Sequence, residues 1–238
     1  MADVFAHLRR RSEVAERMDT DCADFADYQR CLSDLAQVNV VTLTHRPILS
    51  WLQQEARGLR RFSLLDVGCG HGDLLRRIRR WALRHQIDAR LEGLDRNPWS
   101  IQAAMEATPA NAGLGWHVDD VFAFHPDEPF DFIVSSQFTH HLTDAEVIAF
   151  LCWQDAVARR GWVIADLHRH WFAYYGFPLL ARLARWHRFV RMDGQVSIAR
   201  SFTVPEWQSL IAAAGITGDV SVTRYVPSRL CVARRCHH

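Results

Sequence analysis

The stretch FSLLDVGCGHGD, residues 62–73, joins an apolar run to three glycines on alternate positions. The run ends in Asp66, and the glycines are Gly68, Gly70 and Gly72. Glycines at this spacing let a backbone come very close to a neighbouring group, just beyond the end of a strand. The stretch therefore predicts a β-strand followed by a loop that approaches a ligand.

Short apolar segments alternate with amphipathic segments from this stretch to the C-terminus, which is typical of β–α units. Strands are expected over residues 62–67, 89–95, 114–121, 130–138, 161–167, 219–225 and 228–235. The last two strands are joined only by the link VPS, and so short a link requires an antiparallel pair. The pattern predicts an α/β, Rossmann-like three-layer sandwich. Its seven-stranded sheet is mostly parallel with one antiparallel strand, and helices cover both faces.

Two regions lie outside this alternation. Residues 1–60 show helical spacing of apolar side chains and predict an N-terminal helical cap ahead of the main domain, residues 61–238. An insertion at about residues 168–200 is rich in aromatic side chains and arginine. We expect residues 170–191 to form a lid over a hydrophobic pocket, an interfacial membrane contact, or a packing helix of the outer layer.

Composition excludes several classes of protein. The 238 residues carry a net charge of +1, which gives no general attraction to nucleic acid or to anionic membranes. The 6 cysteines fall in no metal-ligand spacing, and no segment is typical of a secretory signal or a membrane span. We therefore expect a cytoplasmic monomer or homodimer without stable membrane insertion and without a nucleic-acid partner.

The glycine loop differs from two familiar phosphate-binding loops. Asp73 stands where the third glycine of the dinucleotide fingerprint would fall, and the chain has no lysine for a P-loop. A carboxylate at Asp66, on the lip of the loop, would repel a pyrophosphate but can hold an ammonium group. These features weaken both phosphate interpretations.

Further acids follow the next two strands. Asp95 ends the second strand, where a carboxylate accepts the hydroxyls of a ribose. Asp119 and Asp120 end the third strand, where a carboxylate can accept the amino group of adenine. With Asp66, these acids favour a ligand with adenine, ribose and a cationic or amino-acid end but no phosphate. S-adenosylmethionine fits that description, although Asp95 alone would serve NAD equally well.

Several motifs carry a family resemblance over about residues 60–238. They are LLDVGCGHGDLL, EGLDRN, HVDDVF, FDFIVSSQFTHHLTDAEV and FTVPEWQSLIAAAGI. Together they resemble the class I S-adenosylmethionine-dependent methyltransferases. The segments HHLTDAE, IADLHRH and ERMD…LAQVN are similar to the small-molecule type, in particular ubiquinone/menaquinone methyltransferases and bacterial polyketide-synthase-associated enzymes that methylate phenols or quinones.

The resemblance assigns a role to each part of the expected cofactor site. The methionine end would lie against the glycine loop, the ribose on Asp95, and the adenine beside the residues that follow the second and third strands. The transferring methyl would lie past the fourth strand. The residues so assigned are Asp66, Gly68, Cys69, Gly70, Gly72, Asp95, Arg96, Asn97, Asp119, Asp120, Val121, Gln137 and Phe138.

Histidines supply the candidate bases, since their pKa lies near neutral pH. His140 and His141 follow the fourth strand and His168 follows the fifth, so all three fall on the ligand-binding edge. His141 is the first candidate, His140 and His168 the next, and each is also consistent with a packing role. A metal site built from these histidines, His170 and Asp166 would hold only one acid, so we expect no bound metal.

The sequence therefore predicts methyl transfer from S-adenosylmethionine to a hydrophobic aromatic small molecule, with S-adenosylhomocysteine as product. O-methylation of a phenol, quinol or polyketide is the first hypothesis, and C-methylation of a quinone precursor is its neighbour. An RNA or protein methyltransferase is less favoured, because SSQF stands where amino-nitrogen methylation typically uses [DNS]PP[FYW]. A catalytically silent cofactor-binding regulator and an oxidoreductase with an atypical loop are the remaining alternatives.

Overall fold

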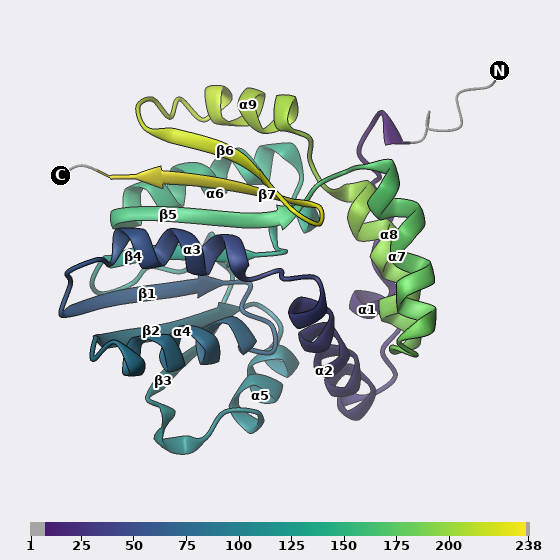
Figure 1. The fold of residues 1–238 in the computed structure, drawn as a ribbon, viewed down its shortest axis with the longest axis horizontal. Helices are drawn as coiled ribbons and strands as arrows, with labels where there is room; N and C mark the ends of the chain where they lie inside the picture. The colour runs from purple at the N-terminus through teal and green to yellow at the C-terminus, as the bar shows by residue number, and fades with distance from the viewer. Residues whose placement is uncertain (1–7, 237–238) are drawn as a thin grey trace.

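The structure, a computed structural model, describes residues 8–236. Residues 1–7 of the expected N-terminal cap lie outside the described residues. Seven strands form one sheet in the order β3-β2-β1-β4-β5-β7-β6 (Figure 1). Their bounds are β1 Arg61–Val67, β2 Asp88–Asp95, β3 Leu114–Val118, β4 Phe130–Ser136, β5 Ala158–Leu167, β6 Val220–Tyr225 and β7 Arg229–Arg235.

The strand directions confirm the expected fold class. β1 to β5 pair in parallel, and β7 lies antiparallel between β5 and β6. The link VPS joins β6 to β7 as expected, because three residues cannot carry the chain back to a parallel start. β3 ends earlier than expected, at Val118, so Asp119 and Asp120 lie in the loop that follows it.

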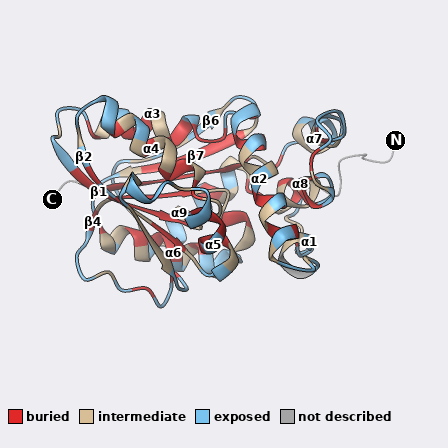
Figure 2. Ribbon diagram, turned by 90° about the horizontal axis from the view of Figure 1, so that it is seen from below, coloured by how far each residue is buried: buried red, intermediate tan, exposed pale blue. Residues whose placement is uncertain are grey.

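Nine α-helices surround the sheet in the described part of the chain. Their bounds are α1 Arg17–Thr20, α2 Phe25–Val41, α3 Arg46–Glu55, α4 Asp73–Arg84, α5 Pro98–Glu106, α6 Asp144–Val157, α7 Trp171–Leu183, α8 Arg188–Arg200 and α9 Val204–Ala213. α3, α4 and α5 contribute to the apolar cluster on one face of the sheet, and α6 and α9 to the cluster on the other. Figure 2 shows these buried residues concentrated along the strands between the helical layers.

Polar residues at the helix starts set several of these boundaries. Asn97 accepts a hydrogen bond from the Trp99 backbone at 2.9 Å and caps α5. Thr143 and Thr203 each form a reciprocal capping box with a glutamate three residues later. Asn97, Thr143 and Thr203 therefore set where α5, α6 and α9 begin.

The helices of the expected cap, residues 1–60, pack in two different places in the structure. α2 packs against α5 and α8, whereas α3 packs on the sheet. Ile48 and Leu52 of α3 are fully buried, and the Trp51 ring meets the Phe132 ring of β4 edge-on at 5.6 Å between centroids. Because α3 buries its apolar face on the strands, it belongs to the three-layer core and not to the cap.

The insertion at residues 168–200 contains two helices. α7 and α8 pack against each other and stand with α1 and α2 at one end of the molecule, beyond the carboxyl ends of the parallel strands (Figure 1). The four helices therefore enclose the sheet edge where α/β proteins bind ligands.

None of the helices in the described residues is long and apolar enough to span a membrane.

Candidate functional site

A cavity of about 710 Å³ opens at the carboxyl ends of β1, β2 and β4. It gathers the sequence-predicted residues Asp66, Gly68, Cys69, Gly70, Asp95, Arg96, Asn97, Asp119, Asp120, Val121, Gln137, Phe138, His140 and His141. Two predicted residues, Gly72 and His168, do not line it. The strand ends bring the others together because parallel strands finish at one edge of the sheet.

Asp66 occupies the base of this cavity at the end of β1. Its side chain is 2% exposed, and its Oδ1 has no hydrogen-bond partner among the described residues. Burial raises the pKa of Asp66 well above its usual value, and the charges of Asp73 and Asp95 raise it further. A buried carboxylate that lacks a hydrogen-bond partner is stabilised by a cationic donor, such as an ammonium group.

The glycine loop shapes one wall of the cavity. Gly68 has φ +69°, and a Cβ there would lie 2.7 Å from the Phe138 ring, so no larger residue fits. Gly70 has φ +49°, and a Cβ there would meet nothing within 4 Å. Gly72 has φ +71° and packs closely against the Trp116 ring. Gly72 therefore serves the contact between α4 and β3, which explains why it does not line the cavity.

Asp95 connects the glycine loop to the loop after β2. Its Oδ2 accepts the Gly70 N–H at 3.0 Å, and its Oδ1 accepts the Asn97 N–H at 2.9 Å. Burial raises the pKa of Asp95, while these two hydrogen bonds act in the opposite direction. The carboxylate is thus fixed in orientation at the middle of the cavity wall, where it can accept neighbouring hydroxyl groups.

Asn39 is a lining residue that sequence reasoning missed. Asn39, near the end of α2, accepts the Gln137 side-chain N–H at 2.7 Å and donates to Asp73 at 3.1 Å. Gln137 itself has φ +55°, an uncommon conformation for a residue with a side chain. This chain of contacts holds Gln137 between α2 and the sheet. The sequence offered only the segment LAQVN as a signal for Asn39.

His140 lies in a chain of buried polar side chains at the cavity wall. Its Nδ1 and the Asp166 Oδ1 are 2.7 Å apart, and its backbone N–H donates to Asp166 Oδ2 at 3.0 Å. Its Nε2 faces Glu16 Oε1 at 3.4 Å, and Ser197 donates to the same Oε1 at 2.8 Å. The His141 Nε2 is 4.0 Å from Glu16 Oε1, with 31% of the His141 side chain exposed.

The charges of this chain depend on one another. Burial alone would lower the pKa of His140, but Asp166 and Glu16 raise it to about 10. Burial alone would raise the pKa of Glu16 and of Asp166, but the positive imidazole lowers each to about 2. The two carboxylates therefore favour the imidazolium form of His140, which makes the more exposed His141 the better candidate for accepting a proton.

The stability of the ligand-free protein should depend on pH through these three groups. Glu16 and Asp166, with pKa values lowered from 4.5 and 3.8 to about 2, stabilise the fold above about pH 4.5 and cease to do so as the pH falls to about 2. His140, with its pKa raised from 6.5 to about 10, stabilises it below pH 6.5 and ceases to do so as the pH rises to about 10. Urea unfolding should therefore show greater stability at about pH 6 than at about pH 9. His140→Gln should show a smaller difference, and an equal difference in both proteins would contradict the assignment.

His168 lies apart from this cluster. It lines neither cavity, and its backbone N–H donates to the Ser228 carbonyl in the link between β6 and β7 at 3.2 Å. Burial, with the nearby charges of Arg224 and His170, lowers the pKa of His168 to about 4. The sequence placed His168 on the correct edge of the sheet, but the structure does not bring it to the site.

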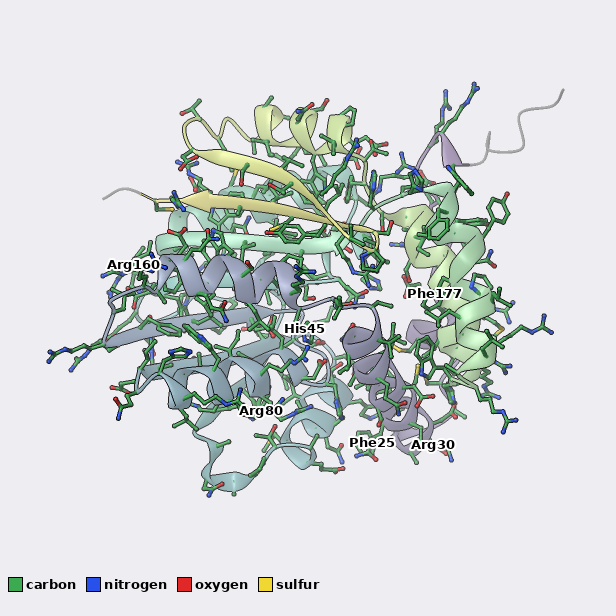
Figure 3. The ribbon with its side chains drawn as sticks, in the orientation of Figure 1. Phe25, Arg30, His45, Arg80, Arg160 and Phe177 are labelled. Atoms are coloured by element: carbon green, nitrogen blue, oxygen red, sulfur yellow. The ribbon has the colours of Figure 1, made fainter. Side chains whose placement is uncertain are left out.

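A second, apolar cavity of about 310 Å³ adjoins the first. Its walls come mainly from α2, α7 and α8, including Phe172, Phe177 and Leu180. Phe177, labelled in Figure 3, stacks on Trp186 with centroids 6.2 Å apart. The two cavities share Glu16, Met18, Leu35, Gln137 and Ser197. An apolar molecule in the smaller cavity would therefore reach the larger one beside Glu16.

The N-terminal arm, defined here as residues 8–16, brings Glu16 into the site. Arg11 pairs with Asp144 at 2.5 Å and donates to the Leu142 carbonyl at 2.8 Å. Arg200 donates to the Val14 carbonyl at 2.8 Å and to the His140 and His141 carbonyls at 3.0 and 2.9 Å. These contacts hold the arm against both histidines. The only signal for Glu16 in the sequence was the segment ERMD, which it begins.

Comparison with known proteins identifies one family. The family described as "Methyltransferase domain" matches residues 15–218. A ubiquinone biosynthesis O-methyltransferase of Rhodopseudomonas palustris (strain BisB18) is 30% identical over 142 residues, which is 55% of this chain and 53% of that protein. The chain thus spans about half the length of this curated relative.

Solved structures with low sequence identity share the fold. The plantazolicin methyltransferase BpumL, in complex with a pentazolic desmethylPZN analog and SAH, has a TM-score of 0.64 at 14% identity, covering 89% of this chain and 97% of its own. The magnesium protoporphyrin IX methyltransferase of Synechocystis PCC 6803 with bound SAH has a TM-score of 0.54 at 12% identity, covering 92% and 90%.

Proposed function

Because the chain belongs to the methyltransferase-domain family, we propose that it transfers a methyl group from S-adenosylmethionine to a hydroxyl oxygen of a hydrophobic aromatic molecule. The observation that carries this proposal is the junction of the two cavities. An acid-lined cavity suited to a cationic adenosyl ligand meets an apolar cavity beside Glu16 and Gln137. S-adenosylhomocysteine is then the second product.

The residues present fit this cofactor. Asp66, buried and lacking a partner for its Oδ1 in the described structure, is suited to hold the ammonium of the methionine end. Asp95 is oriented to accept ribose hydroxyls, and Asp119 and Asp120 lie at the cavity rim for the adenine amino group. The negative charges of these four carboxylates would repel a pyrophosphate, which argues against a nicotinamide dinucleotide.

When bound, S-adenosylmethionine supplies a methyl group activated by its sulfonium. The protein has to align the acceptor, exclude water and remove a proton. We assign proton removal from the acceptor hydroxyl to His141, whose ring lines the larger cavity and faces Glu16. His140, charged and held between Asp166 and Glu16, orients Glu16 at the junction. Gln137 and Phe138 limit the space on the donor side.

Product NMR after incubation with methyl-labelled S-adenosylmethionine and aromatic acceptors tests the proposal. We expect the label on an aromatic O-methyl group of a phenol, quinol or polyketide. A label on a ring carbon would favour C-methylation of a quinone precursor. Label incorporated into RNA or protein would reject the small-molecule proposal, and bound cofactor without any transfer would indicate a regulator.

The smaller cavity is expected to select an apolar acceptor. Leu180 lines it and is 37% exposed, so Leu180→Glu should place a charge at its wall without disturbing the core. We expect KM for a hydrophobic acceptor to rise by about tenfold, with unchanged affinity for S-adenosylhomocysteine. Leu179→Glu is the matched control, since Leu179 is 64% exposed and does not line the cavity. Equal effects of both substitutions would place the acceptor elsewhere.

A further inference from the structure

We propose that Glu16, His140 and His141 form a binding site for one divalent transition-metal cation, of which Zn²⁺ is the type. This cluster, named here the Glu16–His140–His141 triad, lies at the junction of the two cavities. Ion binding goes beyond the proposed function, because it requires neither the methyl donor nor an acceptor.

The three potential ligand atoms converge. One ligand atom from each residue lies within 4.8 Å of the other two. The Glu16 Oε1 lies 3.4 Å from the His140 Nε2 and 4.0 Å from the His141 Nε2. Ligands about 2.1 Å from a tetrahedral ion are separated from one another by about 3.4 Å. The first pair already has this spacing, and His141 needs only a small side-chain movement.

Surrounding groups support two of the ligands in the way metal sites require. The His140 Nδ1 is 2.7 Å from Asp166 Oδ1, which fixes the ring and directs Nε2 toward Glu16. A carboxylate on the distal ring nitrogen is a regular feature of metal-bound histidines. Ser197 donates to Glu16 Oε1 at 2.8 Å and steadies the carboxylate. This support comes from two separate parts of the chain, β5 and α8.

The ligand chemistry selects the class of ion. Two imidazoles and one carboxylate suit Zn²⁺, Fe²⁺ or Mn²⁺, whereas Mg²⁺ and Ca²⁺ prefer oxygen ligands only. Glu16 and His140 are 7% and 3% exposed, and the more open His141 leaves a route for the ion from the larger cavity. Three protein ligands leave at least one coordination position for a further oxygen ligand.

The position of the triad suggests what that oxygen belongs to. This step rests on the proposed function: the acceptor hydroxyl would bind the ion, lose its proton to water, and be held beside Gln137 for attack on the methyl carbon. With the ion bound, the His140 Nε2 would give up its proton to coordinate, and His141 would act as a ligand and not as the base. The sequence predicted no bound metal for a different set of residues, namely Asp166 with four histidines. Glu16 was not in that set.

The test is calorimetric titration of chelator-treated protein, residues 1–238, with ZnCl2. We expect one ion per chain for the wild type, and affinity reduced by more than about tenfold in Glu16→Gln and in His141→Ala. The double variant His168→Ala/His170→Ala is the matched control, since these histidines lie outside the triad, and it should bind like the wild type. MgCl2 should bind much more weakly than ZnCl2.

Three outcomes would overturn the proposal: no Zn²⁺ binding by the wild type, unchanged affinity in both triad variants, or loss of binding only in the double variant. Circular dichroism of each variant establishes that it is folded, and His141, at the surface of the cluster, carries the test if Glu16→Gln does not fold. A parallel titration with S-adenosylhomocysteine separates this proposal from the proposed function, because the two ligands occupy different residues.

Discussion

Asp95→Ala is expected to weaken binding of S-adenosylhomocysteine by about 100-fold or more. The carboxylate is aligned by the Gly70 and Asn97 N–H groups, and two charge-assisted hydrogen bonds to ribose hydroxyls account for a loss of this size. The substitution also removes the contact that fixes the glycine loop. Calorimetric titration of wild type and variant measures the difference directly.

Asp119→Ala provides the comparison for that measurement. Asp119 lines the same cavity but is exposed, so its loss should cost only about tenfold in affinity. If Asp95→Ala bound as tightly as the wild type, the ribose would not lie on Asp95. If Asp119→Ala had the larger effect, the orientation of the adenosyl group in the cavity would be reversed.

His141→Ala is expected to lower kcat by about 100-fold while leaving the affinity for S-adenosylhomocysteine unchanged. The reason is that His141 lies beside Glu16, whereas the proposed cofactor contacts are made by other lining residues, Asp66 and Asp95. Single-turnover methyl transfer and a separate binding titration measure the two quantities. The loss is expected whether His141 takes the proton itself or holds an ion that would lower the pKa of the acceptor hydroxyl.

His168→Ala distinguishes this site from the sequence-based alternative. His168 follows the neighbouring strand but lines neither cavity, so its substitution should change kcat by less than about twofold. Unchanged turnover in His141→Ala would remove its catalytic assignment, although the methyltransferase family would stand. A large loss in His168→Ala would move the acceptor to the end of β5.

Sequence periodicity predicted the sheet well because each strand and its following helix carry local signals. The VPS link required β6 and β7 to be antiparallel, and Asn97 and Thr143 stand at helix starts. Sequence periodicity did not show that α3, expected in the N-terminal cap, packs on the sheet. An amphipathic helix shows which face it buries but not which surface it packs on, and Trp51 packs on β4.

The site was predictable only where it follows the strand ends. Asp66 and Asp95 were found because parallel strands finish at one edge of the sheet. Glu16 and Ser197 lie 181 residues apart in the chain and meet through the packing of the arm on α8, which no local pattern encodes. Histidines that follow neighbouring strands also differ: His140 is buried on Asp166, while His168 lines neither cavity.

A crystal structure of the protein with S-adenosylhomocysteine tests the central claim most directly. The account predicts the amino group on Asp66, the ribose hydroxyls on Asp95, and the sulfur facing the junction of the two cavities beside Glu16 and Gln137. A ligand bound outside the larger cavity, or with its sulfur directed away from the apolar cavity, would contradict the account.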